Sequence, residues 1–280
     1  MKLRPLGRTA WEVAEISCGT YRTFDVAGNA GREKVESLMR ANLAERINLF
    51  DSAPMYGHSE ANIGHAAPRL GKNRTAAGEP AFFIATKVLQ HNLAGAKRQI
   101  ENSFRVIGGR IDLLQIHNMA GWREVLPYLA ELKAEGRIGA TGVTHYDSGA
   151  FGEIEAAMKT GQADLIQVPY NLMERAVERR LLPLARDLGV GVLVMTPICP
   201  IFQRGMLLDR LARWDFKEFG RYGVTDAGGL CLKYLLSKNP EVVLLPATSR
   251  LERIRNNAAV SGQPLFPPEL VRELEQQLGA

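Results

Sequence analysis

Short apolar runs alternate with longer amphipathic segments along the chain. Seven runs predict buried strands because each is short and rich in aliphatic or aromatic residues: residues 47–50, 82–87, 112–117, 138–143, 164–170, 190–195 and 242–246. The runs that start at residues 112, 138, 164 and 190 follow one another at intervals of 26 residues (138 minus 112, and likewise for the others). One strand, one crossover helix and two short loops fill such an interval, so the sequence predicts a repeated β/α unit.

The segments between the runs have the periodicity of helices that pack on one face. Residues 90–109 predict a helix that ends at Gly108. One of its faces carries Leu93, Lys97, Ile100, Phe104 and Ile107, and the stem of Lys97 can cover apolar surface. Residues 225–240 predict another helix, capped by Thr225 and followed by Pro240, with the stripe Ala227, Leu230, Cys231, Tyr234 and Leu235. Both stripes indicate core packing and imply no cofactor role.

A further run, AEISCGT from Ala14, raises the number of predicted strands to eight. Eight parallel strands close a barrel, so the predicted fold class is α/β, a (β/α)8 TIM barrel. Residues 2–13 are left for a short N-terminal β-hairpin that covers the barrel floor. Because no linker rich in proline, glycine or serine divides the chain, we predict a single barrel domain over residues 1–280.

Two other α/β architectures fit the same alternation, an open doubly wound sheet and a two-domain arrangement. An open sheet that binds a dinucleotide carries GxGxxG after its first strand. The sequence GTYRTFDVAG from Gly19 lacks that spacing, which favours the closed barrel. The longest interruption, residues 197–224, follows the seventh strand, and long connections at this end of a barrel usually build the site.

Composition excludes several classes of function. No run of eighteen apolar residues occurs and the first thirteen residues lack the apolar core of a signal peptide, which predicts a cytoplasmic protein without a membrane partner. The formal net charge of +5 is spread along the chain, so no nucleic-acid partner is predicted. Cys18, Cys199 and Cys231 form no CxxC pair and the histidines form no HxH or HExxH pattern, so neither disulfides nor a metal are expected.

Four polar side chains stand at or just after the ends of adjacent strands. Asp51 ends the second strand and Tyr56 follows it, while Lys87 and His117 end the third and fourth strands. A phenol with a pKa of about 10 exchanges protons reluctantly at neutral pH, but the ammonium of Lys87 can lower that pKa, and Asp51 can keep Lys87 charged. His117 can hydrogen-bond a carbonyl oxygen or relay a proton. Each residue alone has an ordinary structural explanation, and only their combination predicts carbonyl chemistry.

Several stretches, in order along almost the whole chain, resemble the aldo-keto reductase family: RPLGRTAWEV, NLFDSAPMYGHSE, IATKV, DLLQIHN, GRIGATGVT, QVPYNLMER and LLPATSRLERIRNN. The resemblance implies the same (β/α)8 fold and identifies Asp51, Tyr56, Lys87 and His117 as the family's catalytic tetrad. It further implies reduction of an aldehyde or ketone to an alcohol by hydride transfer from NADPH, or NADH, with Tyr56 as the general acid.

The C-terminal helix region suits a ligand with several phosphates, because Thr248 opens a predicted helix and arginines follow it. An ordinary basic helix face is the alternative explanation. By resemblance, Arg253 and Asn257 match positions used for the 2′-phosphate and the adenine. The full predicted cofactor set is Gly19, Thr20, Thr144, His145, Gln167, Met195, Thr196, Pro197, Ile198, Thr248, Arg250, Arg253 and Asn257.

This chain departs from the family pattern at four of the implied cofactor positions. Thr144 and His145 stand where the family commonly has a Ser-Asn pair. Met195 replaces an aromatic ring that stacks on the nicotinamide, and a thioether is a softer platform. Ala247 stands where a lysine is often found. The preference for NADPH over NADH is therefore open.

The predicted substrate contacts are Tyr21, Arg22 and Asn118, with Phe24, Met55, Met119 and Trp122 as further candidates for the pocket wall. Arg22 would attract an anionic carbonyl compound, and loop packing is the alternative explanation for all of these residues. The predicted partner is a small-molecule carbonyl substrate.

Two other functions fit the same residues. Lys87 could form a Schiff base in an aldolase-like barrel, although Asp51 beside it would keep the amine protonated. The chain could instead be a nicotinamide-nucleotide-binding regulatory subunit with little turnover, because His145 and Met195 are unusual. We expect a monomer or a weak homo-oligomer.

Overall fold

The computed structural model describes residues 1–71, 82–109, 111–200 and 204–278. Its main sheet contains eight parallel strands in continuous sequence order: β3 (Cys18–Gly19), β4 (Leu49–Asp51), β5 (Phe83–Val88), β6 (Ile111–Ile116), β7 (Ile138–Thr144), β8 (Leu165–Pro169), β9 (Gly191–Met195) and β10 (Val243–Leu244). A parallel bridge between Ile16 and Leu244 joins the two edges of the sheet. Backbone hydrogen bonds from Ser17 N to Leu244 O (2.8 Å) and from Leu244 N to Glu15 O (2.9 Å) support this closure. The predicted barrel is therefore confirmed.

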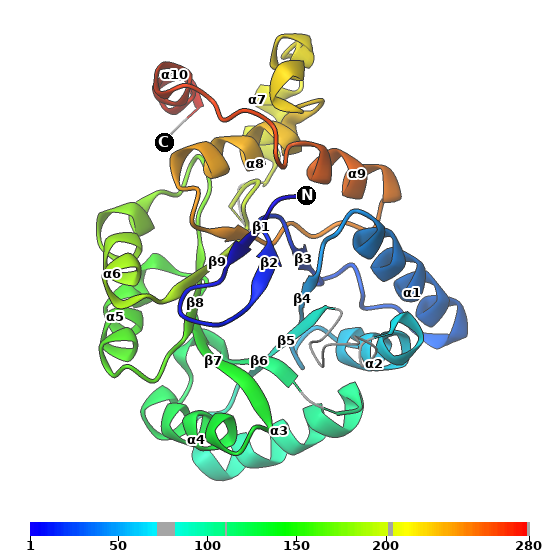
Figure 1. The fold of residues 1–280 in the computed structure, drawn as a ribbon, viewed down its shortest axis with the longest axis vertical. Coiled ribbons are helices and arrows are strands. Elements are labelled where there is room, and N and C mark those ends of the chain that lie inside the picture. Colours follow the sequence, from blue (N-terminus) through cyan, green and yellow to red (C-terminus); the bar gives the residue numbers. More distant parts are fainter. Residues whose placement is uncertain (72–81, 110, 201–203, 279–280) are drawn as a thin grey trace.

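The described part of the chain contains ten α-helices, most of which surround the strands (Figure 1). They are α1 (Gly28–Ala44), α2 (Ser59–Ala66), α3 (Leu93–Ile107), α4 (Trp122–Ala134), α5 (Phe151–Lys159), α6 (Leu181–Leu188), α7 (Arg204–Leu211), α8 (Ala227–Lys238), α9 (Leu251–Ala259) and α10 (Pro268–Leu278). Figure 1 shows α7 and α10 outside the ring that the other helices make around the strands. Within the described residues, none of these helices has the length and apolar character needed to cross a membrane.

The predicted N-terminal hairpin is present as β1 (Leu3–Pro5) and β2 (Glu12–Ala14), which pair antiparallel. In Figure 1 it lies over the middle of the ring of strands. Leu6 and Val13 of the hairpin are fully buried and join the apolar cluster inside the barrel, and the Trp11 ring stacks on Phe83 with a centroid distance of 4.7 Å. The hairpin thus closes one end of the barrel, as expected for a floor.

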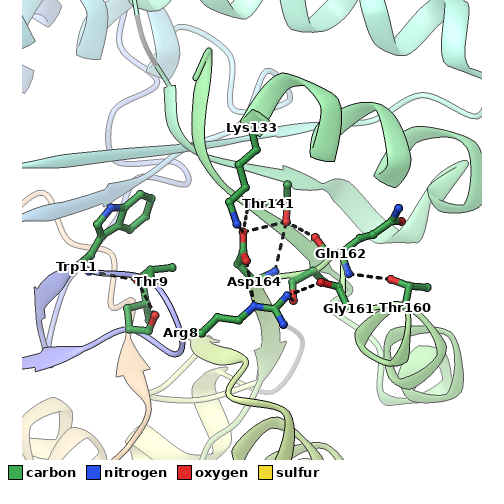
Figure 2. Close-up of polar contacts among 11 residues, drawn as sticks. Arg8, Thr9, Trp11, Lys133, Thr141, Thr160, Gly161, Gln162 and Asp164 are labelled. Atoms are coloured by element: carbon green, nitrogen blue, oxygen red, sulfur yellow. Dashed lines mark hydrogen bonds and ion pairs between the residues drawn. The ribbon is translucent and has the colours of Figure 1, made fainter. Parts of the chain in front are cut away.

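Asp164 fastens the hairpin loop to the barrel wall (Figure 2). Its carboxylate accepts bonds from Arg8 Nε (3.1 Å), Lys133 Nζ (2.6 Å) and the backbone N of Thr141 (3.0 Å). Burial alone would raise the pKa of Asp164, but these donors outweigh burial and lower it. The hairpin is therefore held by an ionised carboxylate at the end of the barrel opposite the predicted site.

The two helix predictions are correct in position and partly wrong in detail. In α3 the side chains of Ile100 and Ile107 are buried and Gly108 caps the helix in a left-handed conformation, as expected. Lys97 is exposed, with its ammonium 4.7 Å from the centre of the Tyr128 ring. At α8, Asp226 rather than Thr225 is the N-cap, because its carboxylate accepts the backbone N–H of Gly229 at 2.7 Å.

Candidate active site

The loop between β4 and α2 carries Tyr56, and buried hydroxyl groups hold it at the barrel mouth. Ser52 Oγ donates to Ser59 Oγ (2.8 Å), Ser59 Oγ donates to Thr20 Oγ1 (2.8 Å), and Thr20 Oγ1 donates to the carbonyl oxygen of Asp51 (2.9 Å). All four residues are buried. This chain fixes the start of the loop relative to the strand end. The sequence places Thr20 among the cofactor contacts. Its hydroxyl is bonded to the backbone carbonyl oxygen of Asp51.

Lys87 and Asp51 form a buried ion pair at the ends of β5 and β4. Lys87 Nζ lies 2.9 and 2.7 Å from the two carboxylate oxygens of Asp51 and also donates to the carbonyl oxygen of Ser52 at 2.7 Å. The two charged residues are 1% and 3% exposed. Burial would lower the pKa of Lys87, but its interactions with Asp51 and Tyr56 outweigh burial, so this pKa is raised. Lys87 is therefore an ammonium, which counts against a Schiff-base nucleophile.

Two glutamine side chains complete the surroundings of Asp51. Gln115 Nε2 on β6 donates to Asp51 Oδ1, and Gln167 Nε2 on β8 donates to Asp51 Oδ2, each at 3.0 Å. Gln167 was predicted from the sequence as a cofactor contact, whereas Gln115 was not singled out. Asp51 thus accepts bonds from an ammonium and two amides, which stabilise its charge in a buried position.

The Tyr56 ring lies directly beside this ion pair. Lys87 Nζ is 5.0 Å from the centre of the ring, and the rings of Tyr56 and His117 are perpendicular, with centroids 6.1 Å apart. Burial raises the pKa of Tyr56 above its usual value of about 10, and Asp51 adds to this effect, while Lys87 acts in the opposite direction. Lys87 thus lowers the pKa of Tyr56 as expected, but burial outweighs its effect and the net shift is upward. The phenol stays protonated at neutral pH, the form that can donate a proton.

His117 is a neutral imidazole in this site. Burial, together with the positive charge of Lys87 and the proximity of His145, lowers its pKa to about 3. Its Nδ1 is buried without a hydrogen-bond partner within the described residues. The residues after it, Asn118 and Met119, have left-handed backbone angles (φ 53° and 54°), so the chain turns sharply away from the strand. A neutral ring can hydrogen-bond a carbonyl oxygen without carrying a charge.

Buried polar atoms without partners collect at the mouth, on the ends of β7, β8 and β9. Within the described part of the chain, Thr144 Oγ1, Gln167 Oε1 and Thr196 Oγ1 are buried and make no hydrogen bond. Such atoms are costly unless a ligand satisfies them. A carboxamide, which both donates and accepts, has the chemistry that hydroxyl and amide oxygens can bind. The residues present therefore fit the amide end of a nicotinamide.

The neighbouring cofactor candidates also lie at this mouth. His145 Nδ1 accepts the backbone N–H of Asp147 at 3.0 Å, and its ring stacks on Tyr146. Met195 ends β9 and is half-buried. Gly19 approaches the end of β10 so closely that a Cβ there would lie 2.9 Å from the carbonyl oxygen of Leu245. A side chain at residue 19 would therefore disturb the closure of the barrel.

The start of α8 brings the remaining cofactor candidates together. A Cβ on Gly228 would lie 3.7 Å from Ile198 Cδ1 and 3.9 Å from Asn257 Oδ1, so the loop after β9 and α9 meet there. Asp226 joins the two helices by accepting from Asn256 Nδ2 at 2.9 Å. Pro197 is buried and Asn257 is 7% exposed. Asp226 was not singled out from the sequence, where the helix cap was assigned to Thr225 and the contact to Asn256 on α9 has no local signal.

The arginines of this region lie at the surface. Arg253 on α9 is exposed, and no ion pair or hydrogen bond of its side chain occurs among the described residues. Arg250 is the N-cap of α9, not a residue of its first turn, and its backbone N–H donates to Thr248 Oγ1 at 3.2 Å. The guanidinium of Arg253 is therefore available to an anionic group near α9.

The predicted substrate residues line the open side of the mouth. The Tyr21 ring lies 5.0 Å from that of Tyr56 and is 47% exposed, and the Arg22 guanidinium lies 5.1 Å from the centre of the Tyr21 ring. Arg22 has a left-handed backbone (φ 62°). Asn118 lies with His145 on an open hollow of about 410 Å³. Tyr21 thus lies beside the phenol with Arg22 next to it, and Asn118 directly follows His117 in the chain.

Metal or disulfide chemistry has no support in the described part of the chain. No group of three or more histidine, cysteine, aspartate or glutamate side chains there is arranged to hold a metal ion. Cys18 and Cys231 are free thiols, and all three cysteines are buried. Burial raises the pKa of the Cys18 thiol to about 12, so it is not a reactive thiolate.

The family model of the Aldo/keto reductase family matches residues 15–278. The chain therefore belongs to the aldo-keto reductase family of oxidoreductases, which confirms the resemblance seen in the sequence. Among similar proteins, the NADH-specific methylglyoxal reductase of Escherichia coli (strain K12) is 27% identical over 333 residues, with 99% of each chain covered. Methylglyoxal reductase YeaE of the same organism is 26% identical over 257 residues, covering 89% of this chain and 86% of that protein.

Solved structures share the fold over almost the whole chain. An aldo/keto reductase from Klebsiella pneumoniae in complex with NADP and acetate has a TM-score of 0.80 at 24% identity, covering 99% of this chain and 95% of that chain. The thermostable aldo-keto reductase Tm1743 also has a TM-score of 0.80 at 24% identity, covering 99% of both chains. At this level of identity, the two structures support the barrel fold alone.

Proposed function

We propose that the protein reduces the carbonyl group of a small aldehyde or ketone to an alcohol, using NADPH or NADH. The observation that carries this proposal is the protonated Tyr56 phenol beside the buried Lys87–Asp51 ion pair, with the neutral His117 ring 6.1 Å from the phenol ring. This arrangement offers a proton donor and a hydrogen-bond donor at one place, which is what a carbonyl oxygen needs as it gains negative charge.

Each residue of the site has a separate task in this reaction. Tyr56 gives its proton to the carbonyl oxygen, and the ammonium of Lys87 stabilises the phenolate that is left behind. Asp51 keeps Lys87 protonated and holds its ammonium group in place beside the phenol. His117 orients the carbonyl oxygen by hydrogen bonding while remaining neutral.

Residues at the ends of β7, β8 and β9 would hold the cofactor. Thr144, Gln167 and Thr196 present the buried unpartnered oxygen atoms that suit the carboxamide, and Met195 would pack against the ring. Asn257 and Arg253 would bind the adenosine end, together with Ile198 and Thr248. When bound, the reduced nicotinamide supplies the hydride that the substrate carbon receives.

The E. coli relative named as NADH-specific shows that family membership does not decide between the two cofactors. Arg253 is the residue of this chain that would favour NADPH, since a guanidinium can bind the 2′-phosphate that NADH lacks. Methylglyoxal belongs in the substrate panel because two relatives carry it in their names. Arg22 at the mouth makes carboxylated aldehydes a second class to include.

Loss of nicotinamide absorbance tests the proposal, with NADPH and NADH offered separately against a panel of aldehydes, ketones and methylglyoxal. Tyr56→Phe removes the proton donor and should lower the turnover rate by about 100-fold or more. Tyr128→Phe removes a phenol hydroxyl on the outer helix α4 and serves as the matched control. If the protein binds a nicotinamide nucleotide but turns over nothing, the regulatory-subunit alternative replaces this proposal.

A further inference from the structure

Gln115 contacts Asp51, the acidic member of the buried ion pair. The proposed reaction gives this contact no role. Its side chain is completely buried, and Nε2 donates to Asp51 Oδ1 at 3.0 Å. The residue sits on β6 with the same inward orientation as Leu113, which belongs to the apolar cluster inside the barrel. A polar side chain at this place among apolar neighbours needs a physical reason.

The chemistry of Asp51 fixes the direction of the Gln115 amide. An ionised carboxylate can only accept hydrogen bonds, so the NH₂ group must face Asp51 and the amide oxygen must face away. That oxygen, Oε1, is buried and has no hydrogen-bond partner within the described residues. Burying an oxygen without a hydrogen-bond partner costs free energy, and an apolar side chain such as that of Leu113 would avoid this cost. The charge-assisted bond to Asp51 is therefore the interaction that offsets it.

The neighbouring strand leaves room for the Gln115 side chain. Gly142 on β7 pairs with Gln115 in the sheet, and a Cβ on Gly142 would lie 2.9 Å from Gln115 Cγ. Gln167 also donates to Asp51, but its second polar atom faces the proposed carboxamide site. Gln115 contacts Asp51 without being part of the proposed cofactor set.

We propose that Gln115 is a positioning residue, whose amide holds the Asp51 carboxylate ionised and oriented so that Lys87 remains an ammonium beside Tyr56. This role rests on the proposed reduction and adds a residue to it. It acts through Asp51 and Lys87, and Gln115 itself does not need to touch the substrate.

Gln115→Met tests the role by removing the donor while keeping the length of the side chain. The turnover rate should fall by about 10- to 100-fold, which corresponds to the loss of one hydrogen bond to a charged group. Nucleotide affinity, measured by fluorescence titration, should change less than about twofold, since no cofactor contact is removed. The control is Leu113→Met, two residues earlier on the same inward face, which should leave turnover unchanged. Equal turnover in the two variants overturns the proposal.

Gln115→Glu provides a second test that does not depend on the first variant folding. A protonated carboxyl can donate to Asp51 as the amide does, whereas an ionised one repels it. Burial against Asp51 should raise the pKa of the new carboxyl from about 4.3 into the range of about 6 to 8. Turnover relative to the parent should therefore be high below this range and fall as the pH rises through it. A constant ratio across the range overturns the proposal.

Four groups near Asp51 titrate outside this pH range. The pKa values of Lys87 and Tyr56 are raised, that of His117 is lowered to about 3, and that of Cys18 is raised to about 12. Glu60 lies close by on α2, bonded to Thr86. Burial raises the pKa of Glu60, and Glu60 is present in both proteins, so its titration enters both sides of the ratio.

The side-chain ammonium signal of Lys87 in ¹⁵N-detected NMR gives a readout that needs no turnover. Gln115→Met should shift or broaden this signal, because Asp51 becomes a less well stabilised anion, and Leu113→Met should leave it in place. An unchanged signal in Gln115→Met overturns the positioning role. If the signal shifts as expected but the parent protein reduces no carbonyl compound, the positioning of Lys87 stands and the proposed reduction falls.

Discussion

Lys87 Nζ lies 2.7 Å from a carboxylate oxygen of Asp51 and 5.0 Å from the centre of the Tyr56 ring. The one ammonium therefore faces a carboxylate that keeps it charged and a phenol whose anion it would stabilise. Because both charged groups are almost completely buried, their interaction is weakly screened and their separation is costly. Removing one member of the pair would therefore be costly, and the remaining role of the ammonium lies in the proposed proton donation.

Removing only the lysine should destabilise the fold more than removing the whole ion pair. Lys87→Met leaves the Asp51 carboxylate buried without its ammonium and should lower the free energy of unfolding by about 3 to 5 kcal/mol. The double variant with Asp51→Asn removes the unpaired charge and should recover at least about half of that loss. Urea-induced unfolding of the parent, both single variants and the double variant measures the coupling.

Lys159→Met is the matched control for this experiment. Lys159 pairs with Glu155 at 2.7 Å on the surface of α5, and its side chain is 59% exposed. Surface pairs contribute little, so this change should lower the free energy of unfolding by less than about 0.5 kcal/mol. If the losses of the two single variants at Lys87 and Asp51 simply add in the double variant, the pair is not coupled as described.

His117 should make the folded protein less stable as the pH falls below about 6.5. Its pKa is about 3 in the folded state because burial and Lys87 disfavour the charged ring. Between these two values the unfolded chain binds a proton that the folded protein does not, so acid favours unfolding. The contribution is complete above the unfolded pKa, and about 2 kcal/mol of it should be lost between about pH 6.5 and 4.5.

Urea unfolding at these two pH values checks the prediction for the parent and for His117→Asn. In the variant, most of the predicted loss of unfolding free energy between these two pH values should disappear. His91→Asn, at an exposed position, should retain the full pH dependence of the parent. A His117→Asn protein with the same pH dependence as the parent would show that this ring titrates normally.

The barrel could be predicted from the sequence because its signals are local and repeated. Each buried strand required a short apolar run, and the interval of 26 residues between the starts of four successive runs left room for one helix. The cap of α8 shows where such reasoning stops. Thr225 and Asp226 are adjacent and both can cap a helix, and only the bond from Gly229 N to the Asp226 carboxylate distinguishes them.

The site could be predicted in part, because its charged residues stand at strand ends. Gln115 was missed since it lies within an apolar run, where the alternation of inward and outward positions does not reveal which polar side chain meets Asp51. The effect of Lys87 on the pKa of Tyr56 was predicted in the right direction, but the net shift could not be predicted from the sequence. It depends on how far burial and Asp51 outweigh the charge of Lys87, and burial depends on the packing of several loops.

Arg253 should discriminate between the two nicotinamide cofactors. If its exposed guanidinium binds the 2′-phosphate, Arg253→Ala should weaken NADPH binding by about tenfold and leave NADH binding nearly unchanged. Arg255→Ala provides the control, because Arg255 is also exposed on α9 but was not matched to the phosphate position. Fluorescence titration of both nucleotides against the three proteins gives the affinities. Equal losses for NADPH and NADH would mean that Arg253 contacts a group common to both.

Arg22 should set a preference for anionic carbonyl compounds. Its guanidinium lies 5.1 Å from the centre of the Tyr21 ring, and that ring lies 5.0 Å from the ring of Tyr56, so an anionic group held by Arg22 would lie within reach of the phenol. Arg22→Met keeps a long side chain at the same left-handed backbone position and removes the charge.

We expect the variant to lose about tenfold in kcat/KM for carboxylated aldehydes, because a charge-assisted hydrogen bond is removed, and to lose less than about twofold for neutral aldehydes. The ratio of the two kcat/KM values, measured for matched pairs of aldehydes with and without a carboxylate, reports the charge preference directly. Arg32→Met, at an exposed position on α1, controls for the change in net charge. Equal losses for neutral and charged aldehydes would assign Arg22 to loop packing against Tyr21, with no part in substrate selection.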